Sequence, residues 1–222
     1  MLKRLESRSA PQQEVEPEKS GDYLYFSVSD PHFTLRRKAI AKDGSTGDIE
    51  TVFDTLDLPH VKGNPEVAAA IGTPIVRLSD NHQKALFIAD VNRTERPVMG
   101  IKDLKSGKIT EILPNVCGAE WSKDGNSIFY SQPDSLNRPH IIKKHSLGTD
   151  FKQDQVLLTE PDEAFYLDLS QTKDKKYTLL YSNSKTTSGV WVVDRETGQM
   201  REVVHKRQGV RVFLEHNRVT YM

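Results

Sequence analysis

The segments that decide the fold are Asp103-Leu-Lys-Ser-Gly-Lys-Ile-Thr-Glu-Ile112 and Asp194-Arg-Glu-Thr-Gly-Gln-Met-Arg-Glu-Val203. Both follow the pattern Asp-x-x-Ser/Thr-Gly-x-apolar-x-Glu-apolar, and their first residues lie 91 positions apart. A polar turn with a glycine, followed by alternating apolar residues, is typical of a β-hairpin. Its recurrence within one chain indicates an architecture built from repeats.

A second element recurs about twice as often. Ser79-Asp80-Asn81, Ser122-Lys-Asp124-Gly125 and Thr172-Lys-Asp174-Lys175 each lie between two strand-like runs, and their aspartates are 44 and 50 positions apart. Each aspartate is expected to bond the backbone of its own turn. A period of about 40–50 residues with four strand-like runs per unit is typical of a β-propeller blade, so the predicted fold class is all-β.

The strand-like runs divide residues 21–222 into blades of four antiparallel strands. We place these blades over residues 21–56, 75–114, 117–160 and 163–206, and a stub over residues 209–222. Strands are predicted at Tyr23–Ser29, Thr34–Ile40, Glu50–Phe53, Ile75–Leu78, Ala85–Asp90, Val98–Asp103, Ile109–Leu113, Ala119–Trp121, Ser127–Ser131, His140–His145, Val156–Thr159, Phe165–Leu169, Tyr177–Ser182, Val190–Asp194, Arg201–Val204, Arg211–Glu215 and, entered but not completed, Val219–Tyr221.

Two connections interrupt this pattern. Residues 43–48 read as a turn, and residues 57–74 as a link between blades with a short helix at Glu66–Ala70. A closed propeller needs about 4–8 blades, because an open ring leaves sheet edges unpaired. About four blades and a stub therefore predict a partial propeller with an incomplete ring, belonging to a larger one.

Composition excludes several classes of function. Lys and Arg total 31, as do Asp and Glu, so the chain is neutral and no strong affinity for nucleic acid or an anionic membrane is expected. The single cysteine fits a reducing compartment, and no apolar stretch is long enough to span a membrane. Residues 1–20 are polar and are predicted to form a disordered leader. We expect a cytoplasmic protein.

A run in the third blade carries a resemblance to a known family. Pro139-His-Ile-Ile-Lys-Lys-His145-Ser-Leu-Gly148-Thr149, continued by Asp154 and Glu160-Pro-Asp162-Glu-Ala-Phe165, resembles the propeller of the prolyl oligopeptidase family. The match is closest to the prolyl endopeptidase-like proteins, with oligopeptidase B next, at Leu113-Pro-Asn-Val116, Glu120-Trp121-Ser-Lys-Asp124, Thr172-Lys-Asp174, Ser184-Lys-Thr-Thr-Ser188-Gly-Val-Trp191, Lys206-Arg207, Gly209-Val210 and Glu215-His216. One departure is Gly189, where relatives tend to carry an acidic residue.

The resemblance implies a function for the longer protein. In this family a seven-bladed propeller covers an α/β-hydrolase domain whose Ser, Asp and His hydrolyse peptides or esters. The propeller restricts entry to short peptides or other small substrates. This chain would then be part of the filter, its partners being the remaining blades and the hydrolase domain. The full-length protein would be a serine-type oligopeptidase or hydrolase, and the chain alone would be inactive.

The chain itself offers no candidate catalytic, cofactor-binding or metal-binding residue. Gly125-Asn-Ser127-Ile-Phe129 lacks the closing glycine of a nucleophile elbow and reads as a hairpin turn. Cys117 reads as a small residue entering a strand rather than as a reactive thiol. His140 and His145 lie five apart in one strand, which puts them on opposite faces, and His205 and His216 flank a blade junction.

Charged and aromatic clusters are interpreted as structural. The groups Lys143-Lys144-His145 and His205-Lys-Arg207 are expected to be solvated edges. The aromatic residues expected to fill the interfaces between blades are Trp121, Phe129, Tyr130, Phe165, Tyr177 and Trp191. Two alternatives to the gating portion of an enzyme remain open: a stand-alone propeller-type scaffold for protein interactions, and a non-functional remnant whose inner faces lack neighbours.

Overall fold

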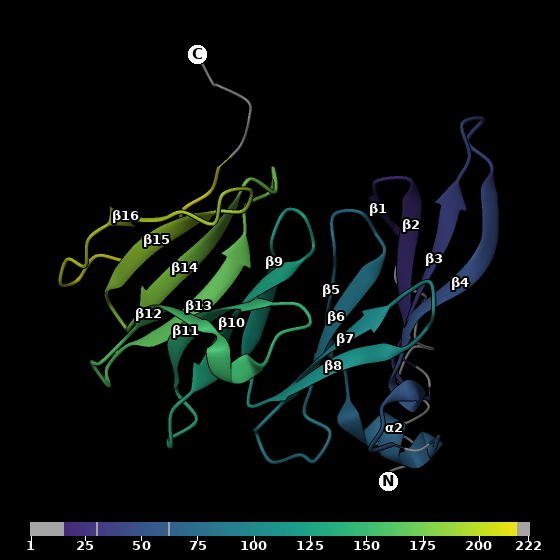
Figure 1. Cartoon of the computed structure of the whole chain (residues 1–222), viewed down its shortest axis with the longest axis horizontal. Helices are drawn as coiled ribbons and strands as arrows, with labels where there is room; N and C mark the ends of the chain where they lie inside the picture. The colour runs from purple at the N-terminus through teal and green to yellow at the C-terminus, as the bar shows by residue number, and fades with distance from the viewer. Residues whose placement is uncertain (1–15, 30, 62, 217–222) are drawn as a thin grey trace, which may run out of the picture. The chain divides into compact units, whose positions relative to one another are not determined.

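The computed structural model describes residues 16–29, 31–61 and 63–216 (Figure 1). These residues form two units, one within residues 1–74 and one within residues 75–222, and each is described by itself. The described part contains four sheets of four strands, all antiparallel, and in each sheet the strands pair in the order in which they occur along the chain. The predicted all-β class, with four-stranded antiparallel blades and no closed sheet, is confirmed.

The first unit is one sheet followed by two short helices. Its strands are β1 (Glu18–Ser20), β2 (Tyr23–Val28), β3 (Thr34–Ile40) and β4 (Thr46–Asp54), and its helices are η1 (Thr55–Asp57) and α2 (Pro65–Ile71). The Asn64 side chain accepts from the amides of Glu66 and Val67 and so caps α2, which is the helix expected between the blades.

Two predicted boundaries in this unit are wrong. Strand β1 lies inside the range predicted as a disordered leader, since Glu18–Ser20 pair with β2 across a turn at Gly21, where φ is +58°. An exposed edge strand needs no apolar residues, so its polar sequence gave no strand signal. Residues 1–15 lie outside the described part. The turn expected at residues 43–48 closes by Ser45, which donates to Asp43 Oδ1 through its amide and its hydroxyl; β4 therefore begins at Thr46.

The second unit contains three sheets. The first is β5 (Ile75–Leu78), β6 (Lys84–Ala89), β7 (Val98–Asp103) and β8 (Ile109–Pro114). The second is β9 (Gly118–Trp121), β10 (Ser127–Pro133), β11 (Pro139–Ser146) and β12 (Gln155–Thr159), with η2 (Phe151–Gln153) before β12. The third is β13 (Tyr166–Gln171), β14 (Tyr177–Asn183), β15 (Ser188–Asp194) and β16 (Met200–Val204). Every strand predicted for these sheets begins and ends within about two residues of its observed bounds.

The repeated Asp-x-x-Ser/Thr-Gly segment is a hairpin turn in both places. The carboxylate of Asp103 accepts from the amide and hydroxyl of Ser106, between β7 and β8. The carboxylate of Asp194 accepts from the amides of Glu196 and Thr197, between β15 and β16. The glycine that follows, Gly107 or Gly198, has φ near +70° and donates to the backbone oxygen of that aspartate. Glycine adopts this conformation without a steric penalty, which explains its place in the repeat.

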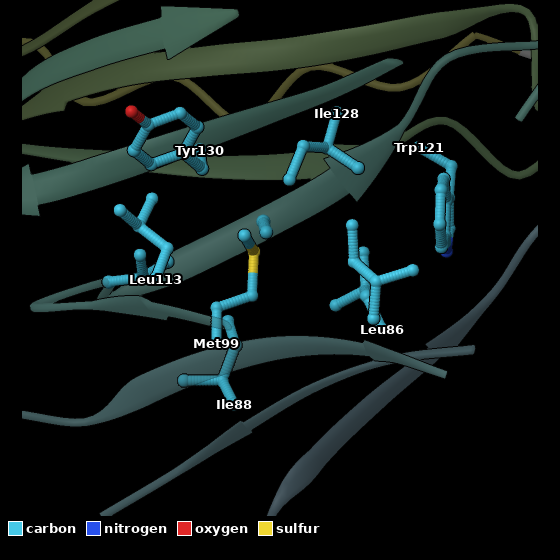
Figure 2. Packing of buried hydrophobic residues seen from close by; sticks show 10 residues of the cluster. Leu86, Ile88, Met99, Leu113, Trp121, Ile128 and Tyr130 are labelled. Atoms are coloured by element: carbon cyan, nitrogen blue, oxygen red, sulfur yellow. The ribbon is translucent and has the colours of Figure 1, made fainter. Parts of the chain in front are cut away.

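A hydrophobic cluster joins the sheets β5–β8 and β9–β12. Figure 2 shows Leu86, Ile88 and Met99 of the first sheet close to Trp121, Ile128 and Tyr130 of the second. Leu113, the remaining labelled residue, extends the cluster along β8, and Trp121 and Tyr130 are almost fully buried. Large apolar side chains from two sheets fill one layer here, which is how neighbouring blades stabilise one another.

Strand β10 packs against neighbouring sheets on both of its faces. Ile128 and Tyr130 point into the cluster just described, whereas Phe129, between them, belongs to a second cluster with Leu167 and Leu180 of the third sheet. Successive side chains of a strand point to opposite faces, so β10 is buried on both. Its continuous apolar run reflects a sheet that lies between two others.

The stub predicted at residues 209–222 differs from expectation. Arg211–Glu215 alternates between exposed and half-buried residues, but it belongs to no sheet in the described part. It lies along the third sheet instead, where the Tyr181 hydroxyl donates to Leu214 O and accepts from Leu214 N, both at 3.1 Å. A strand is completed by a partner strand, and the predicted partner, Val219–Tyr221, lies outside the described residues.

Candidate functional site

The candidate site is a row of side chains on the strands β5, β9 and β13, here called the inner strands; the row is exposed on β5 and β13 and mostly buried on β9. Each is the first strand of its sheet, and β9 contacts both β5 and β13. Exposed residues alternate with half-buried ones along β5 and with buried ones in the first part of β13, as expected where one face packs on the core and the other is open. The open positions of β5 and β13 hold Ile75, Arg77, Tyr166 and Asp168.

An ion pair crosses from β5 to β9 in this row. Arg77 Nε lies 3.2 Å from Glu120 Oε1; the arginine side chain is 49% exposed and the glutamate side chain 8%. Behind this pair, Trp121 Nε1 donates to the backbone oxygen of Arg77 at 3.0 Å. Trp121 therefore fixes the spacing between the two strands, while the Arg77 side chain extends to the open side.

Burial raises the pKa of Glu120, although Arg77 and Arg195 act in the opposite direction. The nearby carboxylate of Asp168 adds to the increase. Asp168 is exposed, and its Oδ1 accepts the amide of Leu169 at 2.8 Å. The row thus presents the Arg77 cation and the Asp168 carboxylate to solvent, while the Glu120 carboxylate is buried beside Arg77. This polar surface is suited to contacting a polar or charged molecule.

The recurring Ser/Thr-x-Asp turns carry the bonds expected of them in two of three cases. Asp124 accepts from the Ser122 hydroxyl and the Asn126 amide, and Asp174 from the Thr172 hydroxyl and the Lys176 amide. In the first turn the prediction for Asp80 is wrong, because Asn81 occupies this position and accepts from Ser79 and Gln83. Asn81 lies two positions after Ser79, as Asp124 lies two positions after Ser122, so Asn81 and not Asp80 is the equivalent of Asp124.

Asp80 instead binds Arg195, which the sequence gave no reason to select. The Arg195 guanidinium lies 2.9 and 3.1 Å from the two oxygens of Asp80, and its Nε donates to Trp121 O at 2.9 Å. It also donates to the backbone oxygen of Lys175 at 2.6 Å. Arg195 is fully buried and joins turns from all three sheets of the second unit. The equivalent position in the other copy of the repeat holds Leu104, so the repeat itself does not require an arginine here.

The residues examined for nucleophilic chemistry occupy structural positions. Ser127 begins β10 after a turn in which Gly125 has φ +66°, so the hairpin interpretation is confirmed. Cys117 precedes β9, and burial raises the pKa of its thiol to about 11. The thiolate is the reactive form of cysteine, so this environment disfavours reactivity.

The cluster Lys143-Lys144-His145 is not a solvated edge as a whole, and that prediction is wrong for His145. Its side chain is fully buried, and its ring stacks on Phe151 with centroids 3.9 Å apart. Nδ1 lies 2.7 Å from Asp154 Oδ1 and Nε2 lies 2.7 Å from Glu111 Oε2. His140, on the same strand, is half-buried and is not a member of this group. The two lysines that precede His145 made the segment read as a solvated edge, although the partners of His145 come from other segments of the chain.

The second basic group, His205-Lys206-Arg207, is divided in the same way. His205 is exposed and pairs with Glu202, whereas Lys206 forms an ion pair with the buried Glu160 and lies 3.9 Å above the ring of Phe165. Glu160 also accepts from the hydroxyl of Ser182. Burial would raise the pKa of Glu160, but Lys206 and Ser182 lower it overall.

Gly189 lies within β15, opposite Ser182, and not in a turn. A β-carbon at this position would lie 2.9 Å from Lys206 Cγ and 3.2 Å from the ring of Trp191. The glycine therefore leaves room for the lysine stem to cross β15 on its way to Glu160.

His216, the last of the histidines singled out in the sequence, binds Asp174 at 2.6 Å and contacts Tyr177 edge to face.

The aromatic residues predicted at blade interfaces are divided between burial and the rim. Trp121, Phe129 and Tyr130 are buried in the two clusters, and Trp191 packs against the second of them. Phe165 and Tyr177 are half-buried and contact Lys206 and His216, respectively. Within residues 16–29, 31–61 and 63–216, no group of three His, Cys, Asp or Glu side chains is arranged to hold a metal ion. No helix in the described part has the length and apolar character needed to cross a membrane.

Comparison with known proteins agrees with this geometry. Residues 1–222 match the family model described as the N-terminal β-propeller domain of prolyl oligopeptidase. The chain is 27% identical to "Protease 2" of Moraxella lacunata over 90% of its own length and 30% of that protein. It is 32% identical to the "Prolyl endopeptidase-like" protein of Gallus gallus over 88% of its length and 25% of that protein.

The fold is also found among solved structures. Oligopeptidase B from Leishmania major superposes with a TM-score of 0.77 at 20% identity, over 92% of this chain and 29% of that one. Oligopeptidase B from Trypanosoma brucei superposes with a TM-score of 0.75 at 19% identity. The chain thus spans 25–30% of the length of these relatives.

Proposed function

The chain belongs to the prolyl oligopeptidase family, as a portion of its N-terminal β-propeller, and on this premise we propose that it gates access to a catalytic domain. The domain would be an α/β-hydrolase carried by a longer parent protein, a serine peptidase or esterase. The observation that carries the proposal is the match over the whole chain to a propeller domain, combined with coverage of 25–30% of the relatives. The residues of the chain also contain no Gly-x-Ser-x-Gly segment.

The inner row supports the gating role. Arg77 and Asp168 present charged groups on the open side of β5 and β13, and the buried Glu120 on β9 pairs with Arg77. In a propeller the inner strands surround the central channel. We propose that this row lines the passage that short peptides or other small substrates cross. We also propose that residues 209–222 begin the next blade, because exposed and half-buried residues alternate over residues 211–216 as in a strand, with Phe213 85% exposed.

The size of the native protein tests the first part. An antibody against residues 137–144 should detect a band of about 80 kDa in the source cells, the size required by seven blades and a hydrolase domain. A lone band at the 25.2 kDa of this chain would contradict the proposal and favour a stand-alone scaffold. Purified residues 1–222 are expected to hydrolyse neither peptides nor esters.

Selectivity of the full-length enzyme tests the second part. We expect Arg77→Ala and Glu120→Ala to raise kcat/KM for a long peptide relative to a dipeptide ester, because they loosen the row. Lys105→Ala, on an exposed hairpin turn, is the matched control and should leave the ratio unchanged. If all three variants give the ratio of the wild type, the row does not line the passage.

The lone cysteine supports a cytoplasmic location for the parent protein. Cys117 forms no disulfide, and a protein with an unpaired thiol suits a reducing compartment. Cell fractionation followed by detection with the same antibody tests this placement, and recovery in a secreted or organellar fraction would overturn it.

A further inference from the structure

Four polar side chains form a buried group between the sheets β5–β8 and β9–β12, here named the His145 cluster: Glu111, Tyr130, His145 and Asp154. Glu111 lies on β8 of the first sheet, whereas Tyr130 on β10 and His145 on β11 belong to the second. Asp154 lies between η2 and β12. The group therefore crosses the boundary between two blades, next to the apolar cluster that joins them.

Every bond in the His145 cluster is short. His145 lies 2.7 Å from Asp154 through Nδ1 and 2.7 Å from Glu111 through Nε2, and the Tyr130 hydroxyl donates to Asp154 Oδ2 at 2.6 Å. The second oxygen of Glu111 accepts from the amide of Gly148 at 2.9 Å. Both carboxylates thus already hold another donor, and the imidazole lies between them.

The number of protons on the ring decides whether this arrangement is satisfied. A neutral imidazole has one N–H and one lone pair, so it can donate to one of the two carboxylates. The other carboxylate would then face a lone pair in a buried site, which is unfavourable. The doubly protonated ring donates to both. Its charge also offsets one of the two negative charges, which burial would otherwise penalise.

We propose that His145 carries a proton on each ring nitrogen and acts as a proton-dependent tie between the two blades. When the ring loses a proton, Glu111 or Asp154 loses its donor, and β8 is held less firmly to β11. The folded state then binds more protons than the unfolded state as the pH rises, so stability falls with increasing pH.

The surroundings allow a proton to reach the cluster. Glu111 is 16% exposed and lines a surface pocket of about 390 Å³. The other charged groups of that pocket are Lys84, Asp103 and Lys108, so the outer side of Glu111 faces two cations and one carboxylate. On the inner side the titratable groups facing the ring are Asp154 and Tyr130, and burial raises the pKa of the tyrosine far enough to keep it a donor.

Two conservative variants of the 222-residue chain test the proposal. In Glu111→Gln the amide NH₂ can donate to Nε2, so a neutral ring satisfies both neighbours and no proton is required. In the matched control, Tyr130→Phe, one hydrogen bond is lost but the ring still lies between two carboxylates. Hydrogen exchange is measured for β8 and β11 from about pH 6 to about pH 9, where histidine charge changes matter. Strand β14 serves as the internal reference.

In the wild type, exchange in β8 and β11 should accelerate by about tenfold over this range relative to β14, after correction for the intrinsic rate, because one buried carboxylate loses its donor. Tyr130→Phe should exchange faster throughout but keep the same pH dependence. Glu111→Gln should lose that dependence. Equal pH dependence in the wild type and Glu111→Gln, or none in the wild type, overturns the proposal.

Discussion

Arg195 and Asp80 are 115 positions apart in the sequence, yet both oxygens of the aspartate accept from the same guanidinium, at 2.9 and 3.1 Å. Arg195 is fully buried and Asp80 lies at the rim. The two residues come from the turn after β15 and the turn after β5, the third and first sheets of the second unit. This pair is the longest-range charged contact within that unit, among the described residues.

Replacing Arg195 should be strongly destabilising. Arg195→Ala leaves Asp80 and the oxygens of Trp121 and Lys175 without their donor, and breaking a buried charged network in this way costs about 3–5 kcal/mol. Arg195→Lys keeps the charge but loses the planar fork and should recover less than half of the loss. Urea unfolding midpoints measure both, and Arg201→Ala, exposed on β16, is the control. Equal midpoints for all variants would show that the network contributes no stability.

Substituting Gly189 should destabilise the third sheet. The β-carbon of Gly189→Ala would lie 2.9 Å from the Lys206 stem, so the lysine or the Trp191 ring must move, at a cost of about 1–3 kcal/mol. Lys206→Ala shortens the side chain that the added carbon would meet. In this background Gly189→Ala should therefore lower the free energy of unfolding by less than it does in the wild type.

The matched control is Gly47→Ala, where no atom lies within 3.7 Å of the added carbon and φ is not positive; the nearest is Ala39 Cβ at 3.8 Å. Thermal unfolding of the four variants (with Lys206→Ala alone) gives the coupling between positions 189 and 206. A purely additive double mutant would mean that the collision is not the cause.

Stability should depend on Asp174 at acid pH. Burial acts to raise the pKa of Asp174, but the Thr172 hydroxyl, the Lys176 amide and His216 together lower it to about 2. Because the folded pKa lies below the unfolded value of about 3.9, this contribution is present above about pH 4 and disappears as the pH falls toward 2. Asp174→Asn should be less stable than the wild type at neutral pH and should lose stability less steeply between about pH 4 and about pH 2. Circular dichroism at a series of pH values measures this, and parallel curves would contradict the assignment.

Cys117 should react slowly with alkylating reagents. Partial burial raises the pKa of its thiol to about 11, so the thiolate fraction near neutral pH is small. Iodoacetamide labelling followed by mass spectrometry should be much slower in the folded chain than in the urea-unfolded chain. The same rate in both would show that the site is open to reagent.

Much of the fold could be predicted because the signals for it are local. The alternating strands and the Asp-x-x-Ser/Thr-Gly turns are read within about ten residues, and the turn bonds at Asp103 and Asp194 explain why the pattern recurs. Strand β1 escaped prediction for the same reason: as an exposed edge it carries only Glu, Lys and Ser. Arg211–Glu215 has the alternation of a strand, but a strand also needs a partner, which local sequence does not supply.

The polar groups between blades could not be predicted, because each is assembled from distant segments. His145 directly follows two lysines in the sequence, and its partners lie 34 positions before it and 9 after it. Asp80 was predicted to bond its own turn because it is the aspartate of that turn. The residue equivalent to Asp124 is Asn81, one position further along the chain. Glu120 and Arg77 lie 43 positions apart, one blade period, so a search at that spacing would have found them.

The order of pairing within the sheets bears on how the second unit forms during synthesis. Consecutive strands pair throughout, so each sheet can assemble as soon as its own segment leaves the ribosome, without waiting for later residues. The ion pair of Asp80 cannot form this early, since its partner Arg195 is made 115 residues afterwards. Until Arg195 is made, the turn after β5 lacks the guanidinium that binds Asp80. Nascent chains arrested on the ribosome before residue 195 has emerged should therefore be less resistant to protease at the β5–β6 turn than chains arrested after it has emerged. Both kinds of chain contain the complete first sheet of this unit.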